Sequence, residues 1–134
     1  MAEITASMVK ELRDKTDAGM MDCKKALMEC NGDMTAAIEH LRKTGVMKAE
    51  KRSGKSVKEG KIYALVSGGK AVMVEILSET DFVASNEKFF EYVKAAAGRV
   101  LDKVSGDGDI SAKAQALEKD NIVNLIAVIG ENIQ

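Results

Sequence analysis

The sequence predicts an α+β protein in which three short helices precede an antiparallel β-hairpin that further helices cover. Helical apolar spacing with capping signals fills residues 1–45, and the apolar period changes to two between residues 61 and 77. Helical spacing returns from about residue 86. A chain of 134 residues, 46% apolar and 31% charged, can form a packed core and a solvated surface, so we do not expect disorder over most of its length.

The first two helices are predicted from their caps and apolar stripes. Thr5 is a good N-cap for the first helix, which should end near residues 16–19. Its inward positions are Met8, Val9 and Leu12. The second helix should begin near Asp22, and its inward positions are Ala26, Leu27 and Cys30.

A turn signal, Asn31-Gly32-Asp33, separates the second helix from the third. Glycine accepts the left-handed position after a helix, and aspartate can cap the helix that follows. The third helix should end near Gly45, and its inward positions should be Ala37, Ile38 and Leu41. Three helices with such short joints predict a compact bundle over residues 1–45.

Residues 42–61 are rich in lysine and arginine, with Gly54 and Gly60 among them. A basic patch for RNA or for an acidic partner is one interpretation, and a solvated linker over residues 46–60 is the one we favour. No aromatic residue interrupts the run, so it offers no stacking platform for single strands. The whole chain has 20 basic and 21 acidic residues and a net charge of −1, which argues against a general nucleic-acid binder.

Residues 61–134 are expected to form an α+β core module. Gly68-Gly69 predicts a two-residue hairpin loop, because both positions of such a loop require positive φ. In that register Leu65 faces Val72 and Tyr63 faces Val74. An isolated hairpin is only marginally stable, so helices or further strands must support this one.

The helices of this core module follow the hairpin. Ser85 or Asn86 can cap a helix that runs to about Val104. A last helical region ends at Gly130, after apolar residues at helical spacing: Ile122, Leu125, Ile126 and Ile129. With only two strands, the sheet is incomplete, and we expect the module to be incomplete at its carboxyl-terminal side.

Candidate catalytic groups are scarce. His40 is the only histidine, and a single helical histidine is far more often a surface or packing residue than a base. No cluster has metal-ligand spacing and no glycine-rich phosphate loop precedes a helix, so we predict neither an enzyme nor a cofactor or metal. With no apolar run of 18 residues and no signal peptide, the expectation is a cytoplasmic protein without membrane contact.

Two features suit contact with another protein. Met20 and Met21 lie at a helix joint, where at least one of these flexible side chains should be exposed. Asp81 and Phe82 follow the hairpin directly. Phe82 can be read either as a core residue in a loop or as an exposed aromatic wedge beside a charge, and the residues alone leave both readings open.

These residues carry a resemblance to bacterial elongation factor Ts. It runs in order along essentially the whole chain and is most specific in two strings, Met20-Met21-Asp22-Cys23-Lys24-Lys25-Ala26-Leu27 and Thr80-Asp81-Phe82-Val83-Ala84. Shorter matches flank them: Met1-Ala2-Glu3-Ile4-Thr5-Ala6, Val9-Lys10-Glu11-Leu12-Arg13, Asn31-Gly32-Asp33 and Ile129-Gly130-Glu131-Asn132-Ile133. Asp17 departs from the pattern, since it stands where the family usually has glycine.

The resemblance implies a guanine-nucleotide exchange factor for elongation factor Tu, with no nucleotide site of its own. It implies that residues 1–45 form a ubiquitin-associated-like domain that docks on the partner through Arg13, Met20 and Met21. The segment Thr80–Val83 would then be the working edge, with Asp81 and Phe82 entering near the partner's magnesium and phosphate site, and Ile129 a further apolar contact.

The family pattern continues beyond Gln134 with the rest of its core. We therefore expect either a fragment or a shortened protein. This leaves an alternative function, a binding module that docks on elongation factor Tu without exchange activity.

Overall fold

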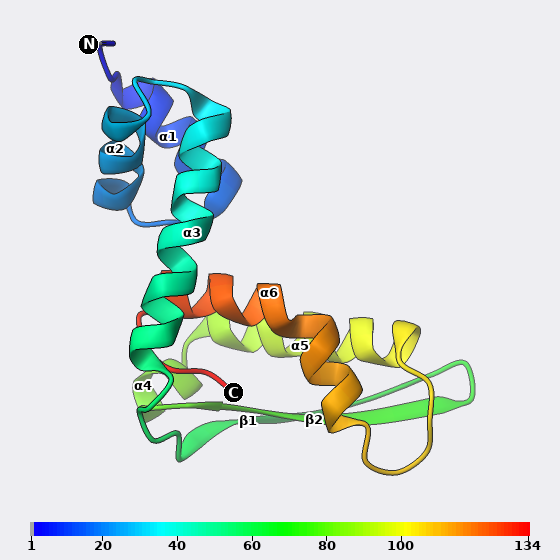
Figure 1. Ribbon diagram of the computed structural model, residues 1–134. Helices are drawn as coiled ribbons and strands as arrows, with labels where there is room; N and C mark the ends of the chain where they lie inside the picture. The colour runs from blue at the N-terminus through cyan, green and yellow to red at the C-terminus, as the bar shows by residue number, and fades with distance from the viewer. Residues whose placement is uncertain (1) are drawn as a thin grey trace. The chain divides into compact units, whose positions relative to one another are not determined.

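The computed structural model describes residues 2–134, and over these residues it has an α+β fold with six helices and one two-stranded antiparallel sheet (Figure 1). The chain divides into two compact units. The first contains the residues up to Lys51 together with Val123–Gly130, and the second contains Arg52–Ile122 together with Glu131–Gln134. None of the described helices is long and apolar enough to cross a membrane.

The first unit is built on α1 (Ala6–Thr16) and α2 (Met20–Glu29), which pack against each other. The Thr5 hydroxyl accepts a hydrogen bond from the Met8 backbone N–H at 3.2 Å, so the predicted N-cap is confirmed. The helix ends at Asp17, which adopts a left-handed conformation with φ 59° and donates its N–H to the Arg13 carbonyl. Asp17 thus occupies a conformation that usually favours glycine.

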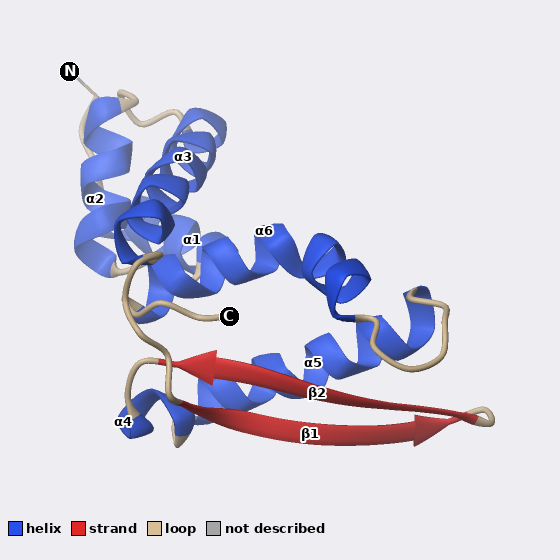
Figure 2. Cartoon of the chain, turned by 60° about the horizontal axis from the view of Figure 1, so that its bottom comes forward, coloured by secondary structure: helices blue, strands red, loops and turns tan. Residues whose placement is uncertain are grey.

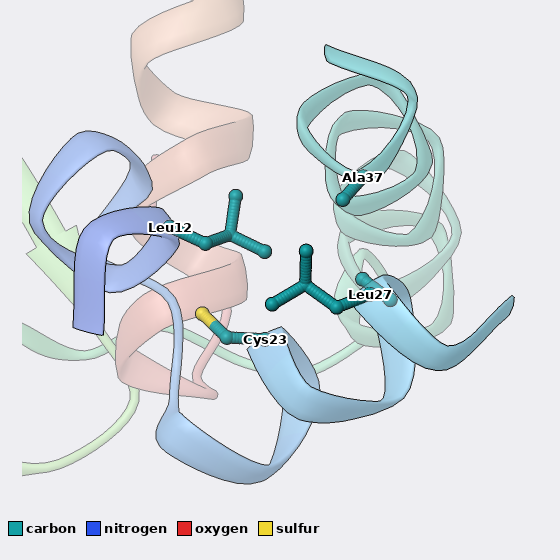
Figure 3. Close-up of a cluster of buried hydrophobic side chains, with 5 residues drawn as sticks. Leu12, Cys23, Leu27 and Ala37 are labelled. Atoms are coloured by element: carbon teal, nitrogen blue, oxygen red, sulfur yellow. The ribbon is translucent and has the colours of Figure 1, made fainter. Parts of the chain in front are cut away.

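A small apolar core joins these helices to α3 (Met34–Arg52). Figure 3 shows Leu12, Cys23 and Leu27 pointing toward one another, with Ala37 approaching from α3. Burial raises the pKa of the Cys23 thiol, which keeps it neutral and makes it a small packing residue here. The Asn31-Gly32-Asp33 turn is also as predicted: Gly32 has φ 80° and the Asp33 carboxylate accepts the Ala36 N–H at 3.0 Å.

The third helix differs from the prediction. It continues to Arg52 instead of ending near Gly45, so the first part of the predicted linker is helical. Gly45 is buried in the middle of the helix, where a β-carbon would lie 3.3 Å from the Ala127 side chain. This glycine therefore permits a close approach and does not stop the helix. Ile38 was predicted to be buried, but it is 37% exposed.

The second unit is built on the hairpin of β1 (Glu59–Ser67) and β2 (Lys70–Ser78). Its register pairs Tyr63 with Val74 and Leu65 with Val72, as predicted. Both loop glycines have positive φ, 57° at Gly68 and 77° at Gly69. The predicted two-residue loop is therefore confirmed.

One face of the hairpin is covered by α5 (Glu87–Lys103), which packs on both strands (Figure 2). The Asn86 side chain caps it by accepting the Lys88 N–H at 2.8 Å. The buried residues of this helix are Phe89, Val93, Ala96, Ala97 and Val100. The opposite sheet face carries well-exposed apolar side chains at Ile62, Val66 and Met73.

The last residues of the chain pair with the end of β2 through an isolated bridge. The backbone groups of Leu77 and Gln134 exchange two hydrogen bonds, of 2.7 and 3.1 Å, and Ile133 forms an antiparallel bridge with Ser78. Ile133 is 2% exposed, so its side chain fixes this segment by burial as well. Backbone hydrogen bonds therefore hold residues 133 and 134 against the end of β2.

A buried carboxylate joins α5 to the first part of α6 (Ser111–Ile129). Glu118 is 6% exposed; it accepts hydrogen bonds from the Arg99 guanidinium and, at 2.9 Å, from the Tyr92 hydroxyl. Burial alone would raise the pKa of Glu118, but the hydrogen bonds from Arg99 and Tyr92 outweigh it, so this pKa lies below its ordinary value. The ionised carboxylate is the form that the fold stabilises.

The glycines of the second unit give a paired stability prediction. At Gly60, where φ is 155°, a β-carbon would lie 2.2 Å from the Ile76 carbonyl oxygen, whereas nothing lies within 4 Å of one at the helical Gly98. We expect Gly60→Ala to lower the free energy of unfolding by about 2 kcal/mol or more. Gly98→Ala should raise it by roughly 0.5–1 kcal/mol. Urea unfolding of both variants tests this, and equal effects would contradict it.

A pH prediction follows from Glu118. Its pKa is lower in the folded chain than in the unfolded chain, so its stabilisation is present above about pH 4.3 and is lost as pH falls through the folded pKa. We expect Glu118→Gln to cost about 2 kcal/mol at pH 7 and much less near pH 2. The exposed Glu91, paired with Lys94, provides the control, because Glu91→Gln should cost less than about 0.5 kcal/mol. A pH-independent cost at Glu118, measured by urea unfolding, would contradict the prediction.

Candidate functional site

The segment after the hairpin forms a one-turn helix, α4 (Asp81–Ala84), where the sequence suggested a loop. Thr80 is its N-cap, and its hydroxyl oxygen accepts the Val83 N–H at 3.4 Å. The backbone N–H of Ala84 donates to the Thr80 carbonyl at 3.2 Å. The helical geometry turns this segment immediately after β2 and leads it into the cap of α5.

Within this turn, the side chains divide between inside and outside. Ala84 is buried and Val83 is half-buried, whereas Asp81 is exposed and Phe82 is 85% exposed. This decides between the two readings of Phe82, because a core phenylalanine would be covered. Keeping an aromatic ring exposed to water is unfavourable, and contact with a partner would bury it.

The base of the turn is fixed by the neighbouring structure. α4 packs against both β1 and β2, and α5 begins after Asn86. The Ser78 hydroxyl, which is fully buried, donates to the Thr80 carbonyl at 3.0 Å. Phe82 therefore projects from a turn that is anchored to the hairpin on one side and to α5 on the other.

Sequence reasoning missed the groups that hold Thr80 from a distance. The Glu131 carboxylate accepts the Thr80 N–H at 3.0 Å and the Thr80 hydroxyl at 2.7 Å. The Glu79 carboxylate accepts the Asn132 N–H at 2.7 Å. Thr80, Glu131 and Asn132 lie in the strings quoted above and Glu79 directly precedes one of them, but nothing in their spacing indicates that segments about fifty positions apart meet.

The remaining predicted site residues lie in the first unit. At the start of α2, Met20 is 58% exposed and Met21 is 63% exposed, so both side chains are available and not only one. Arg13 is exposed on α1. Ile129 is half-buried at the last position of α6.

The described residues contain no group of three or more His, Cys, Asp or Glu side chains that could hold a metal ion. The single histidine, His40, lies with its Nε2 atom 3.1 Å from the Glu29 carboxylate on the surface of the first unit. Three of the predicted site residues, Met20, Met21 and Phe82, thus have exposed apolar side chains.

Known relatives match nearly the whole chain. Elongation factor Ts of Rhizobium meliloti (strain 1021) is 53% identical over 137 residues, which cover 97% of this chain and 44% of that protein. Elongation factor Ts of Rhizobium johnstonii (strain DSM 114642 / LMG 32736 / 3841) is 54% identical over 140 residues, which cover 99% of this chain and 44% of that protein. A family model described as elongation factor TS matches residues 79–134.

An α+β chain with exposed methionines and an outward-facing aromatic turn has the features of a protein-interaction module. The comparisons make this class specific: over nearly its whole length the chain is similar to elongation factor Ts, and its residues 79–134 match that family's model. It spans less than half the length of the curated relatives it matches. The range matched by the family model contains both Thr80 and Glu131.

Proposed function

We propose that this chain acts in translation elongation as a guanine-nucleotide exchange factor for elongation factor Tu. The observation that carries the proposal is the 85% exposure of Phe82 on a turn that is capped and packed against the hairpin. A side chain that displaces part of another protein must be exposed. The backbone that carries it must also keep its conformation during contact with the partner. The similarity to elongation factor Ts supports elongation factor Tu as the partner on which such a side chain acts.

The mechanism is a shift between two states of the partner. A GTPase holds its nucleotide through a magnesium ion and through backbone contacts to the phosphates, so a small displacement of the phosphate loop weakens both. Phe82 enters between partner helices and Asp81 acts near the magnesium site, and both favour the nucleotide-poor state. The factor speeds release by its differential affinity for that state and leaves the final nucleotide equilibrium unchanged.

Docking is the task of the first unit in this proposal. Its three helices α1, α2 and α3 form a ubiquitin-associated-like domain that binds the partner through Arg13, Met20 and Met21. The exposure of both methionines supports this, because methionine adapts to irregular apolar surfaces. Ile129, half-buried at the end of α6, adds an apolar contact.

A second candidate function is docking on elongation factor Tu without exchange, and the exposure of Met20 and Met21 favours it, because these side chains can bind a partner without the turn that carries Phe82. Binding and release must therefore be measured separately. Binding to elongation factor Tu without faster GDP release would select this second function, provided that the full-length Rhizobium meliloti relative accelerates release in the same assay.

The wedge can be tested by removing its ring. We expect Phe82→Ala to reduce the acceleration of GDP release by roughly tenfold or more, as truncation of an interface hot spot does. Met73→Ala is the matched control, because Met73 is 71% exposed in the same unit but lies on the open sheet face. Release of a fluorescent GDP analogue provides the measurement. Equal effects of the two variants would contradict a special role for Phe82.

The docking surface can be tested by binding alone. We expect the double substitution Met20→Ala with Met21→Ala to weaken affinity for elongation factor Tu by at least about tenfold, through lost apolar contact. The maximal release rate at saturating chain should change little. Met47→Ala, at a residue of α3 that is 58% exposed, is the control. Calorimetry measures the affinity, and unchanged binding of the double variant would refute docking through α2.

A further inference from the structure

We propose that Glu131 is a positioning residue for the exposed turn and that Asn132 secures the segment carrying it. The inference rests on the proposed function, since the turn carries Phe82. A helix as short as Asp81–Ala84 has too few internal hydrogen bonds to hold itself, because nucleation is costly and only propagation repays it. Its geometry must therefore be imposed by groups outside it.

The Glu131 carboxylate imposes it through Thr80. One oxygen accepts the Thr80 N–H at 3.0 Å and the other accepts the Thr80 hydroxyl at 2.7 Å. Because the hydroxyl proton points to Glu131, the hydroxyl oxygen turns its lone pairs toward the Val83 N–H, which it accepts at 3.4 Å. The carboxylate thus selects the rotamer in which Thr80 caps α4.

Glu79 and Asn132 form the reciprocal clamp. While Glu131 accepts the backbone N–H of residue 80, Glu79 accepts the backbone N–H of Asn132 at 2.7 Å. The side-chain amide of Asn132 also donates to the backbone carbonyl of Lys55 at 2.8 Å. The guanidinium of Arg52 lies 3.8 Å from the Glu79 carboxylate. Asn132 is 3% exposed, so these hydrogen bonds are protected from water.

The backbone and one apolar side chain hold the same segment from its other side. Gln134 pairs with Leu77 through two backbone hydrogen bonds, and Ile133 is buried. Two clamps, a backbone pairing and a buried side chain therefore hold the segment from which Glu131 reaches Thr80. All of these contacts lie within the second unit.

These contacts matter because the exposed ring of Phe82 cannot fix its own direction. An exposed ring makes few packing contacts, so its direction is set by the backbone from which it projects. If Thr80 is released, α4 samples other conformations, and contact with the partner must first order it. Loss of Glu131 should consequently lower the maximal rate of GDP release, while docking through Met20 and Met21 continues.

The test uses Glu131→Gln in the whole 134-residue chain. Glutamine keeps the volume, but its NH2 group replaces one of the two carboxylate oxygens, so it cannot accept the two hydrogen bonds of Thr80 at the two positions that Glu131 uses. We expect amide hydrogen exchange at Val83, Ala84 and Ser85 to become roughly tenfold faster, with buried amides of α5 unchanged. The maximal acceleration of GDP release should fall by a similar factor, and the concentration for half-maximal effect should stay within about twofold. Glu75→Gln, which removes an exposed carboxylate of β2, should change neither quantity.

A second pair of variants at Thr80 guards against a simple folding defect. Thr80→Ser keeps the hydroxyl and should retain slow exchange in α4, whereas Thr80→Val should resemble Glu131→Gln. The effect of the double variant Glu131→Gln with Thr80→Val should be clearly smaller than the sum of the two single effects, because both changes remove the same hydrogen bond between the Thr80 hydroxyl and Glu131. Additive effects would overturn the inference.

The outcomes separate this inference from the proposed function. Unchanged α4 exchange in Glu131→Gln overturns the positioning role, whatever happens to GDP release. Faster α4 exchange with an unchanged maximal release rate also overturns it, provided that Phe82→Ala does slow release. Faster α4 exchange when Phe82→Ala has no effect on release supports the role of Glu131 in holding the turn and refutes the proposed function.

Discussion

Burial of one face of α5 against one face of the β1–β2 hairpin is the interaction on which the second unit depends. Two strands alone cannot exclude enough water to be stable. Helix α5 supplies the missing layer, with Phe89 and Val93 fully buried and Phe90 meeting Tyr63 edge to face at 6.0 Å between ring centroids. Because α4 follows β2 and precedes α5 along the chain, this packing fixes the positions of both ends of the turn that carries Phe82.

Apolar burial and hydrogen bonding have different tasks around that turn. Burial stabilises the platform, but it is non-directional and does not set the conformation of four residues on the surface. The directional contacts do so: Glu131 holds Thr80, Ser78 holds the carbonyl of the same residue, and Asn132 ties the segment to the backbone near Lys55. The exposed side chain of Phe82 thus depends on hydrogen bonds beneath it that hold its backbone in one conformation.

Features specified by neighbouring residues could be predicted from the sequence. The Thr5 and Asn86 caps and the Gly68-Gly69 loop depend on a few adjacent positions, and the structure has them as expected. Gly45 was misread because a glycine that stops a helix and one that admits a neighbouring helix look alike in sequence. The exposure of Phe82 and the contact of Glu131 with Thr80 depend on distant segments, which local patterns do not reveal.

The separation of 51 positions between Thr80 and Glu131 also has a kinetic consequence. The cap of α4 requires closure of a long loop, whereas the hairpin and α5 form from local contacts. We therefore expect the turn to be among the last parts of the second unit to become ordered during folding, after the hairpin has acquired its helical cover. For the same reason it should open first under native conditions, by detachment of residues 131–134 from β2, while the sheet beneath stays closed.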